Sequence, residues 1–424
     1  MSDLIARGRL LRQQGRHSDA EACLRQAIAA EPDDALAFTE LAQCLLEQDG
    51  RRTEALGAID RAISLEPGYS HLHALRSQIL SRLDRDREAL DAADAAIAMD
   101  PDQGWYFAVK AGALAGLERY AEAEATCRQA LALDADDDLA ANLLAHLLRI
   151  QGKTAESRLA ADRLLADEPE SPYAHFNAGW TALQGGDHRR AESHFREALR
   201  LDAGFEPARD GLLESFRARS PLYRAYLWWN FQMQRFSTRA QWAILIGFVL
   251  AVNFGRRLLE LLHPLAGTAL ITVYACLVLW SWLAPGLGNL LIAADSQARH
   301  ALRTSERRLG FVAGGGFILG LLLVVVSLML DFLPGLLIGG ALALGAVPAR
   351  LFIGNESPRG RVLFGCILAF VYLVGLGTAI GEAFRGESAE LSGRTDQSIT
   401  AAVIAVAACT WLGSVPALVR ERPR

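Results

Sequence analysis

Two patterns of apolar and polar positions divide the chain near residue 220. Before that point, small and apolar residues recur at the three- and four-residue steps of amphipathic helices, and Gly, Asp or Pro breaks the pattern at short intervals. After it, apolar runs of about 20 residues follow one another with few charges, which is the length a helix needs to span a bilayer. The sequence therefore predicts an all-α protein in which an array of short helices precedes a bundle of long apolar ones.

The short helices repeat with a period of 34 residues. Prolines 32, 67, 101 and 169 each follow an acidic residue at intervals of 35, 34 and 68. Glycines 15, 152 and 186 fall between the two helices of a copy, where a positive φ is expected. A set of small or bulky positions moves with the prolines and should fill the helix crossings: Ala20, Leu24, Ala27, Ala55, Ile59, Ala62, Ala89, Ala93, Ala96, Ala123, Cys127, Ala130, Ala191, Phe195 and Ala198, with a degenerate copy at Ser157, Ala161 and Leu164.

This pattern resembles the tetratricopeptide repeat over about residues 1–204. The resemblance implies about six helix-turn-helix repeats stacked into an α-solenoid, with residues 205–220 as a capping helix over the last repeat. Repeat 2 has one extra residue near Gly50, which we place in its interhelical turn. The resemblance also implies a concave face, lined by the first helix of each repeat, on which a protein or peptide partner would lie.

Seven residues on the first helices are candidates for that groove, because aromatic residues and arginine supply most hot-spot energy at interfaces. They are His71, Trp105, Asn142, His146, Arg149, Tyr173 and Trp180. For the tryptophans, two interpretations are equally open: they anchor a ligand, or they fill the core between repeats. We expect Arg149 to be exposed at a helix end.

Residues 221–239 mix aromatic side chains with arginines and are predicted to lie at a membrane–water interface, where such residues meet the headgroups. The same mixture suits single-stranded nucleic acid, but the apolar runs that follow favour the membrane. The candidate interface residues are Tyr223, Tyr226, Trp228, Trp229, Arg235 and Arg239.

Residues 240–418 form the predicted membrane domain, and residues 419–424 a basic tail. Six spans are expected at 240–258, 265–284, 309–330, 333–351, 361–381 and 398–418. The first span is the weakest, because Arg256 follows a clean run that begins only at Trp242. With both termini in the cytoplasm, fifteen arginines lie inside and four outside, so the positive-inside rule favours that orientation.

Small residues at four-residue spacing are expected to let these helices pack closely, at Gly316 and Gly320, at Gly335 and Gly339, and at Gly377 and Gly381. The charges in this half lie near span ends; Asp331 and Glu382 are placed at outer ends, where hydration costs little. A buried charge in mid-span would have indicated an ion pathway, and the predicted spans contain none.

Charge and cysteine content reduce the number of functions that the chain could have. The chain has 424 residues and a net charge of -5, but residues 1–220 hold 26 bases and 38 acids, whereas residues 221–424 hold 17 bases and 10 acids. An acidic array disfavours nucleic acid as a partner. Six cysteines without a CxxC spacing indicate a reducing compartment and no metal site. The N-terminus lacks the apolar core of a signal peptide, and abundant arginine and alanine suggest a GC-rich bacterium.

These observations predict a multi-pass protein of the bacterial inner membrane, with its repeats in the cytoplasm. No nucleophile, phosphate-loop or metalloprotease motif is found, so we expect no enzyme activity and no cofactor. The leading hypothesis is an adaptor that tethers a protein partner at the membrane. The alternatives are a transporter or channel with a regulatory repeat domain, and a membrane enzyme acting on lipid-linked substrates. A membrane-protein partner or a second copy of the chain fits each of them.

Overall fold

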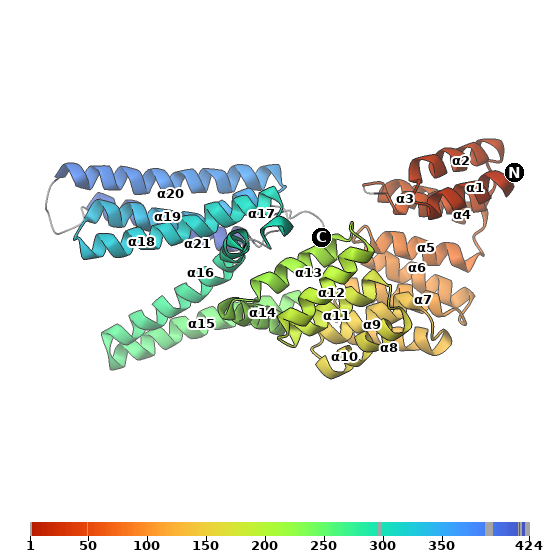
Figure 1. Ribbon diagram of the computed structural model, residues 1–424, viewed down its shortest axis with the longest axis horizontal. Helices are drawn as coiled ribbons and strands as arrows, with labels where there is room; N and C mark the ends of the chain where they lie inside the picture. The colour runs from red at the N-terminus through yellow and green to blue at the C-terminus, as the bar shows by residue number, and fades with distance from the viewer. Residues whose placement is uncertain are drawn as a thin grey trace. The chain divides into compact units, whose positions relative to one another are not determined.

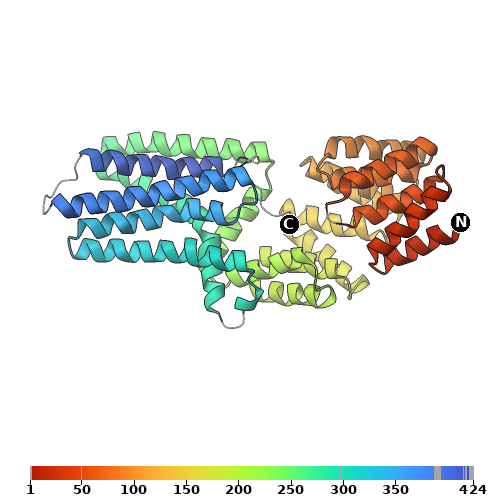
Figure 2. The same cartoon turned by 90° about the horizontal axis from the view of Figure 1, so that it is seen from above.

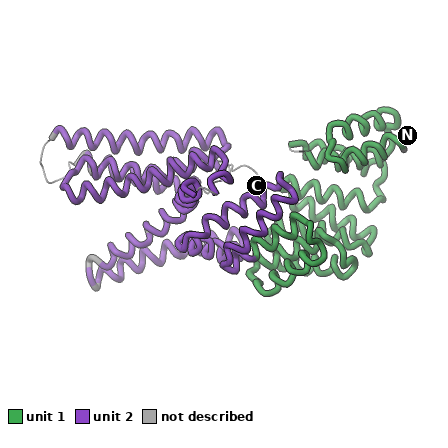
Figure 3. The backbone as a smooth tube through the Cα atoms, in the orientation of Figure 1, with its two compact units in different colours: residues 1–181 green, residues 182–424 purple. Residues whose placement is uncertain are grey.

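The computed structural model describes residues 2–48, 50–295, 298–385, 393–413, 415 and 418–419, and all regular structure in this part of the chain is helical (Figure 1). The chain divides into two compact units, residues 1–181 and 182–424 (Figure 3). The boundary falls inside a helix of the sixth repeat. The second half of that repeat therefore belongs to the same unit as the long apolar helices.

Fourteen short helices make up the repeat region, and every even-numbered one has 14 residues. Such regularity is what the 34-residue period predicts. The helices are α1 (Ser2–Gln13), α2 (His17–Ala30), α3 (Ala35–Leu46), α4 (Arg52–Leu65), α5 (Ser70–Ser81), α6 (Asp86–Met99), α7 (Gly104–Gly116), α8 (Tyr120–Leu133), α9 (Asp138–Ile150), α10 (Thr154–Asp167), α11 (Pro172–Gln184), α12 (His188–Leu201), α13 (Glu206–Arg217) and α14 (Pro221–Gln234).

The positions predicted to fill the helix crossings are buried in every copy, including the degenerate fifth. Each lies on the second helix of its pair, and alanine there lets the two backbones approach closely. The prediction is confirmed for Ala20, Leu24, Ala27, Ala55, Ile59, Ala62, Ala89, Ala93, Ala96, Ala123, Cys127, Ala130, Ser157, Ala161, Leu164, Ala191, Phe195 and Ala198.

The turns within the pairs need a left-handed residue, and glycine supplies it where the sequence predicted. Gly15, Gly152 and Gly186 have φ values of 73°, 71° and 84°. In repeats 3 and 4 the same place is taken by Asp84 and Glu118, both with φ of 59°, which the sequence did not signal. The extra residue of repeat 2 lies in the interhelical turn as predicted, because the connection from α3 to α4 (47–51) is one residue longer than that from α5 to α6 (82–85), and α3 and α5 have the same length.

The segment after repeat 6 contains two helices, and α13 coincides with the predicted capping helix. α14 follows it, has the 14-residue length of the earlier second helices, and is linked to α13 by a hydrogen bond from Tyr223 to Glu214. Tyr223, Leu227 and Phe231 are buried along one face of α14. On α13, Gly211 allows close contact with α12, since a Cβ at that position would lie 2.3 Å from the buried ring of Phe195.

Long apolar helices follow α14, and among the described residues five stretches are long and apolar enough to cross a membrane: Thr238–Leu261, Ala266–Ala294, Thr304–Met329, Leu333–Ile353 and Pro358–Phe384. In chain order, the helices of this region are α15 (Thr238–Leu262), α16 (Pro264–Ala294), η1 (Arg299–Ala301), α17 (Thr304–Leu309), the π-helical η2 (Gly310–Gly315), α18 (Gly316–Met329), α19 (Leu333–Ile353), α20 (Pro358–Arg385) and α21 (Gly393–Leu412).

Most predicted spans coincide with these helices, with three differences. The weak first span is one continuous helix, and Arg256 pairs with Glu260 one turn on at 3.4 Å. The second continues through Pro285 to Ala294, beyond its predicted end at 284. The sixth coincides with α21, whose described apolar part, Gln397–Leu412, is shorter than a span. The six-span topology therefore stays a prediction, and the basic tail after Val419 lies outside the described residues.

Close glycine contact joins α18 to α19, which run side by side with α20 (Figures 1 and 2). A Cβ on Gly320 would lie 2.7 Å from the carbonyl oxygen of Gly339, and one on Gly339 would lie 2.8 Å from that of Gly320. The predicted packing role is thus confirmed for this pair. It is wrong for Gly316, Gly377 and Gly381, where an added Cβ would meet nothing within 4 Å.

Glu382 is not the hydrated residue that the sequence suggested. It is 5% exposed, because α21 folds back beside α20 and covers it. The Thr395 hydroxyl donates a hydrogen bond of 2.6 Å to its Oε1. A buried carboxylate near the end of an apolar helix is therefore part of this bundle.

Candidate functional site

The predicted groove residues form two clusters on the first helices of unit 1. The first joins repeats 3 and 4. The His71 ring on α5 stacks on the Trp105 ring of α7 at 5.0 Å and 30°. Trp105 also meets Tyr106 edge-on at 5.7 Å and packs against the core, while both His71 and Trp105 stay half-buried. This cluster therefore fills the core with one face and leaves another accessible to a ligand.

The second cluster joins α9 to α11. The side-chain amide of Asn177 donates to Oδ1 of the Asn142 side chain at 2.8 Å. One turn further along α9, Arg149 Nη2 donates to His146 Nδ1 at 3.0 Å. The same guanidinium lies 5.5 Å from the centre of the Trp180 ring, a cation–π contact. Five polar or aromatic side chains are thus ordered together between two neighbouring first helices.

Burial sets the electrostatics of this second cluster. Arg149 is only 7% exposed, so the expectation that it is exposed at a helix end is wrong. Its side chain lies along α11, which covers it. Burial lowers the pKa of Arg149 to about 10, so it stays charged at neutral pH. Burial, followed by the charge of Arg149, lowers the pKa of His146 to about 3. The imidazole is therefore neutral, and its Nδ1 is an acceptor.

Tyr173 is the most accessible of the groove candidates. It lies at the start of α11 and is 56% exposed, whereas Trp180, two turns later, is half-buried and meets Phe176 edge-on at 6.4 Å. An exposed tyrosine, a half-buried tryptophan and a fixed arginine provide one apolar contact surface with a cation inside it. Aromatic side chains and arginine are the residue types enriched at the centres of protein interfaces.

The predicted interface residues on α14 and the segment after it do not share one environment. Trp228 and Trp229 are 61% and 53% exposed, and Arg235 and Arg239 are also exposed, so each is available to a membrane surface. Tyr226 is half-buried. Tyr223 is 3% exposed and donates a 2.8 Å hydrogen bond to Glu214 of α13, so its assignment as an interface residue is wrong.

Tyr223 belongs instead to a buried polar network that joins α13 to the long helices. The Glu214 carboxylate pairs with Arg217 at 2.6 Å, and the guanidinium donates two hydrogen bonds to Asn289 Oδ1 of α16, at 2.6 and 3.0 Å. Asn289 in turn donates to the backbone oxygen of Glu306 on α17 at 3.1 Å. Burial is the largest influence on the pKa of Arg217 and lowers it, but Glu214, Tyr223 and Glu306 together outweigh burial, so the pKa is raised overall.

Ion pairs surround that network at the start of α17 and the end of α16. Arg209 pairs with Glu306 at 2.6 Å, Arg219 pairs with Asp295 at 2.6 Å, and Arg303 pairs with Glu206. We name this set of contacts the joint. It attaches α13 and the turn after it directly to the α16–α17 connection. The joint is therefore a connected network of hydrogen bonds and ion pairs, not a set of isolated surface pairs.

Sequence reasoning missed the joint. It read Arg217 and Arg219 only as positive charges on the inner side of a membrane. One signal was available in the sequence: the polar residue Asn289 interrupts an apolar run directly after Gly288. The structure explains the glycine, because a Cβ on Gly288 would lie 2.8 Å from Arg217 Cγ. No group of three or more metal-ligating side chains is found among the described residues.

Family comparison agrees with the geometry of the helix pairs. A family model described as tetratricopeptide repeat matches residues 5–70 and 142–204. The helix array is built of tetratricopeptide repeats. Such solenoids present extended concave surfaces to their ligands, so the array serves protein–protein interaction with a protein or peptide partner. No curated protein matches the chain in sequence.

Many solved structures are similar to the repeat region. A tetratricopeptide repeat protein from Parabacteroides merdae is 17% identical, with a TM-score of 0.45 over 49% of this chain and 81% of its own. Pseudomonas aeruginosa PilF is 18% identical, with a TM-score of 0.40 over 49% and 95%. YrrB, described as having an unusual peptide-binding site, is 20% identical, with a TM-score of 0.31 over 44% and 95%. At these values the likeness does not extend to a partner or an activity.

Proposed function

We propose that the protein is a membrane-anchored adaptor. Its tetratricopeptide repeats bind a cytoplasmic protein or peptide across the His71–Trp105 and His146–Arg149–Trp180 clusters, and its apolar helices hold that partner at a bacterial inner membrane. The observation that carries the proposal is the joint. Through Arg217 and Asn289, the end of the array is hydrogen-bonded directly to the apolar helices, which supports a role in which the repeats and the membrane anchor work together.

The binding half of the proposal is tested at Tyr173. Because Tyr173 is more exposed than Arg149, replacing it should disturb folding less. A photo-crosslinking amino acid at position 173 in intact cells should capture one discrete protein. The control is the same substitution at Leu159, which is 62% exposed on α10, a second helix that does not line the groove. Equal labelling from both positions, or none from position 173, would remove the groove as the binding site.

The anchoring half is tested by extraction of membranes with alkaline carbonate. The full chain should remain in the pellet, because five helices are long and apolar enough to span. A chain that ends at residue 204 should be released. Recovery of the full chain in the supernatant would contradict the membrane assignment without bearing on the groove.

The transport alternative is favoured by one observation, the buried Glu382 with its Thr395 donor. Ionisable groups within membrane segments commonly mark ion or proton pathways. Under that alternative, Glu382→Gln abolishes function in cells while leaving capture at position 173 intact. Under the adaptor proposal, the same variant keeps function, and Tyr173→Ala loses it.

A further inference from the structure

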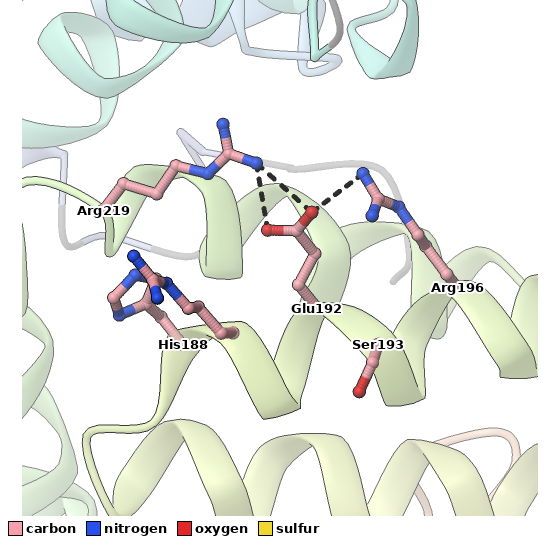
Figure 4. A pocket seen from close by; sticks show the side chains of 6 residues that line it. His188, Glu192, Ser193, Arg196 and Arg219 are labelled. Atoms are coloured by element: carbon pink, nitrogen blue, oxygen red, sulfur yellow. Dashed lines mark hydrogen bonds and ion pairs between the residues drawn. The ribbon is translucent and has the colours of Figure 1, made fainter.

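A cavity of about 590 Å³ opens beside the first half of α12, and its lining is strongly basic (Figure 4). The lining residues are His188, Arg189, Glu192, Ser193, Arg196 and Arg219. Figure 4 shows the Glu192 carboxylate between two guanidinium groups, with Arg196 at 2.8 Å and Arg219 at 3.0 Å. The one carboxylate of the lining faces three arginines and a histidine, so the cavity favours an anion.

The two arginines bonded to Glu192 are held in place before any ligand arrives. Their guanidinium carbons lie over the same buried ring, that of Phe216, at 5.7 Å for Arg196 and 4.8 Å for Arg219. A stacked, hydrogen-bonded guanidinium loses little rotamer freedom when it binds an anion. The lining is therefore organised rather than a loose collection of surface charges.

The same three-residue arrangement occurs twice earlier in the array, where it is neutralised internally. In repeat 1, Glu21 pairs with Arg25 and Arg51, and a second carboxylate, Glu54, pairs with both bases. In repeat 4, the corresponding residues are Glu124, Arg128, Lys153 and Glu156. Each earlier copy thus balances two bases with two carboxylates.

The last copy departs from this balance in two ways. The position of the second carboxylate, three residues after the outer base, is taken by Leu222. The position after the first residue of the helix, which is Ser18 in repeat 1 and Ala121 in repeat 4, is taken by Arg189. Asp295 at the end of α16 restores one negative charge through Arg219. One arginine in excess remains, and Arg189 is the residue that distinguishes this copy.

A second hollow of about 450 Å³ adjoins the first and shares His188 with it. Its lining includes Leu227, Trp228 and Phe231 from α14, together with Arg224. Leu222, at the vacant carboxylate position, is 66% exposed. A basic cavity next to an aromatic and aliphatic hollow suits a molecule with a phosphate at one end and an apolar chain at the other.

Both hollows lie at the ends of the long apolar helices. Arg219 contacts Asp295 directly after α16, and α14 is separated from α15 only by residues 235–237. If these helices span a membrane, as the proposed function holds, the hollows lie at headgroup level. The arginine and tryptophan content of the lining is typical of that level.

We propose that the cavity beside α12 binds a phosphate group, and that the molecule carrying it is an anionic phospholipid. Arg189 and Arg219 contact the phosphate, His188 lines both hollows, and the acyl portion lies against Leu227 and Trp228. The lipid then attaches the last repeats to the bilayer surface beside the joint. The lipid assignment rests on the proposed anchoring; the phosphate site does not.

The test uses the full chain in detergent, titrated with phosphatidylglycerol and with phosphatidylcholine and read by native mass spectrometry. Wild type should bind phosphatidylglycerol about tenfold more tightly than phosphatidylcholine, as one charge-assisted contact would produce. Arg189→Ser, which restores the residue of repeat 1, should abolish that preference. Arg190→Ser removes the same charge from the neighbouring position outside the cavity and should leave the preference unchanged.

A parallel titration with inorganic phosphate separates the two sources of the anion. If phosphate raises the Tm of wild type but not of Arg189→Ser, while neither lipid is preferred, the ligand is a free phosphate and the lipid assignment is overturned. If neither lipid nor phosphate distinguishes Arg189→Ser from Arg190→Ser, the site itself is overturned. Carbonate extraction of the source membranes, done before detergent is added, shows separately whether the membrane assignment has failed.

Discussion

Acidification from pH 7 to pH 5 should destabilise the folded repeat array through His146, in a range where carboxylates contribute little. In the folded array its pKa is about 3, because burial and the adjacent Arg149 charge both oppose a second cation. In the unfolded chain it returns to about 6.5. The unfolded state therefore binds the extra proton first, so stability is constant above that value and falls as the pH drops towards the folded pKa.

The size of the effect follows from linkage. Between pH 7 and pH 5, a histidine that stays neutral when folded and has a pKa of about 6.5 when unfolded lowers the free energy of unfolding by about 2 kcal/mol. His146→Gln removes the titration and keeps a carbonyl oxygen that can accept from Arg149. The variant should therefore lose about 2 kcal/mol less than wild type over the same range.

The assay is urea unfolding of residues 1–204, followed by circular dichroism at pH 7, 6 and 5. His71, whose pKa burial also lowers, titrates in both proteins and cancels in the difference. His73→Gln is the matched control, because it removes a half-buried histidine on α5, away from the Arg149 cluster of the same array. Parallel pH profiles for wild type and His146→Gln would refute the claim that the imidazole is held neutral beside Arg149.

Three further perturbations test the packing and the joint. Gly211→Ala should destabilise the full chain by about 1–3 kcal/mol, because its Cβ would lie 2.3 Å from the Phe195 ring. Gly57→Ala, in open space on α4, should instead stabilise the chain. Thermal unfolding of the two variants measures both effects. Arg217→Ala should weaken the joint by about 3–5 kcal/mol, seen as faster hydrogen exchange in α13, with Arg224→Ala as the control that leaves exchange unchanged. Gly339→Ala should lower the Tm in detergent by separating α19 from α18, whereas Gly377→Ala should not; equal effects would contradict the close crossing.

Sequence alone determined the repeat region because its contacts are local. Each second helix packs on its own partner and its neighbours, so a 34-residue period places Ala20, Ala55 and Ala191 in equivalent surroundings, and all three are buried. Turn glycines are equally local, since a positive φ depends on two adjacent helices; Gly152 was predictable on that ground. The long apolar helices were predictable for the same reason, because a spanning helix is recognised from the length and hydropathy of one segment, without its packing partners.

Tertiary structure decided what depends on contacts between distant residues. Arg217 meets Asn289 across 72 positions, and Arg209 meets Glu306 across 97, so no local pattern marks them as partners. Arg149 looked exposed because the period of α9 says nothing about α11, whose Trp180 covers its guanidinium. Periodicity assigns a residue to a face of its helix; which helix then packs against that face, and whether it removes a charge from water, is decided only when the chain has folded.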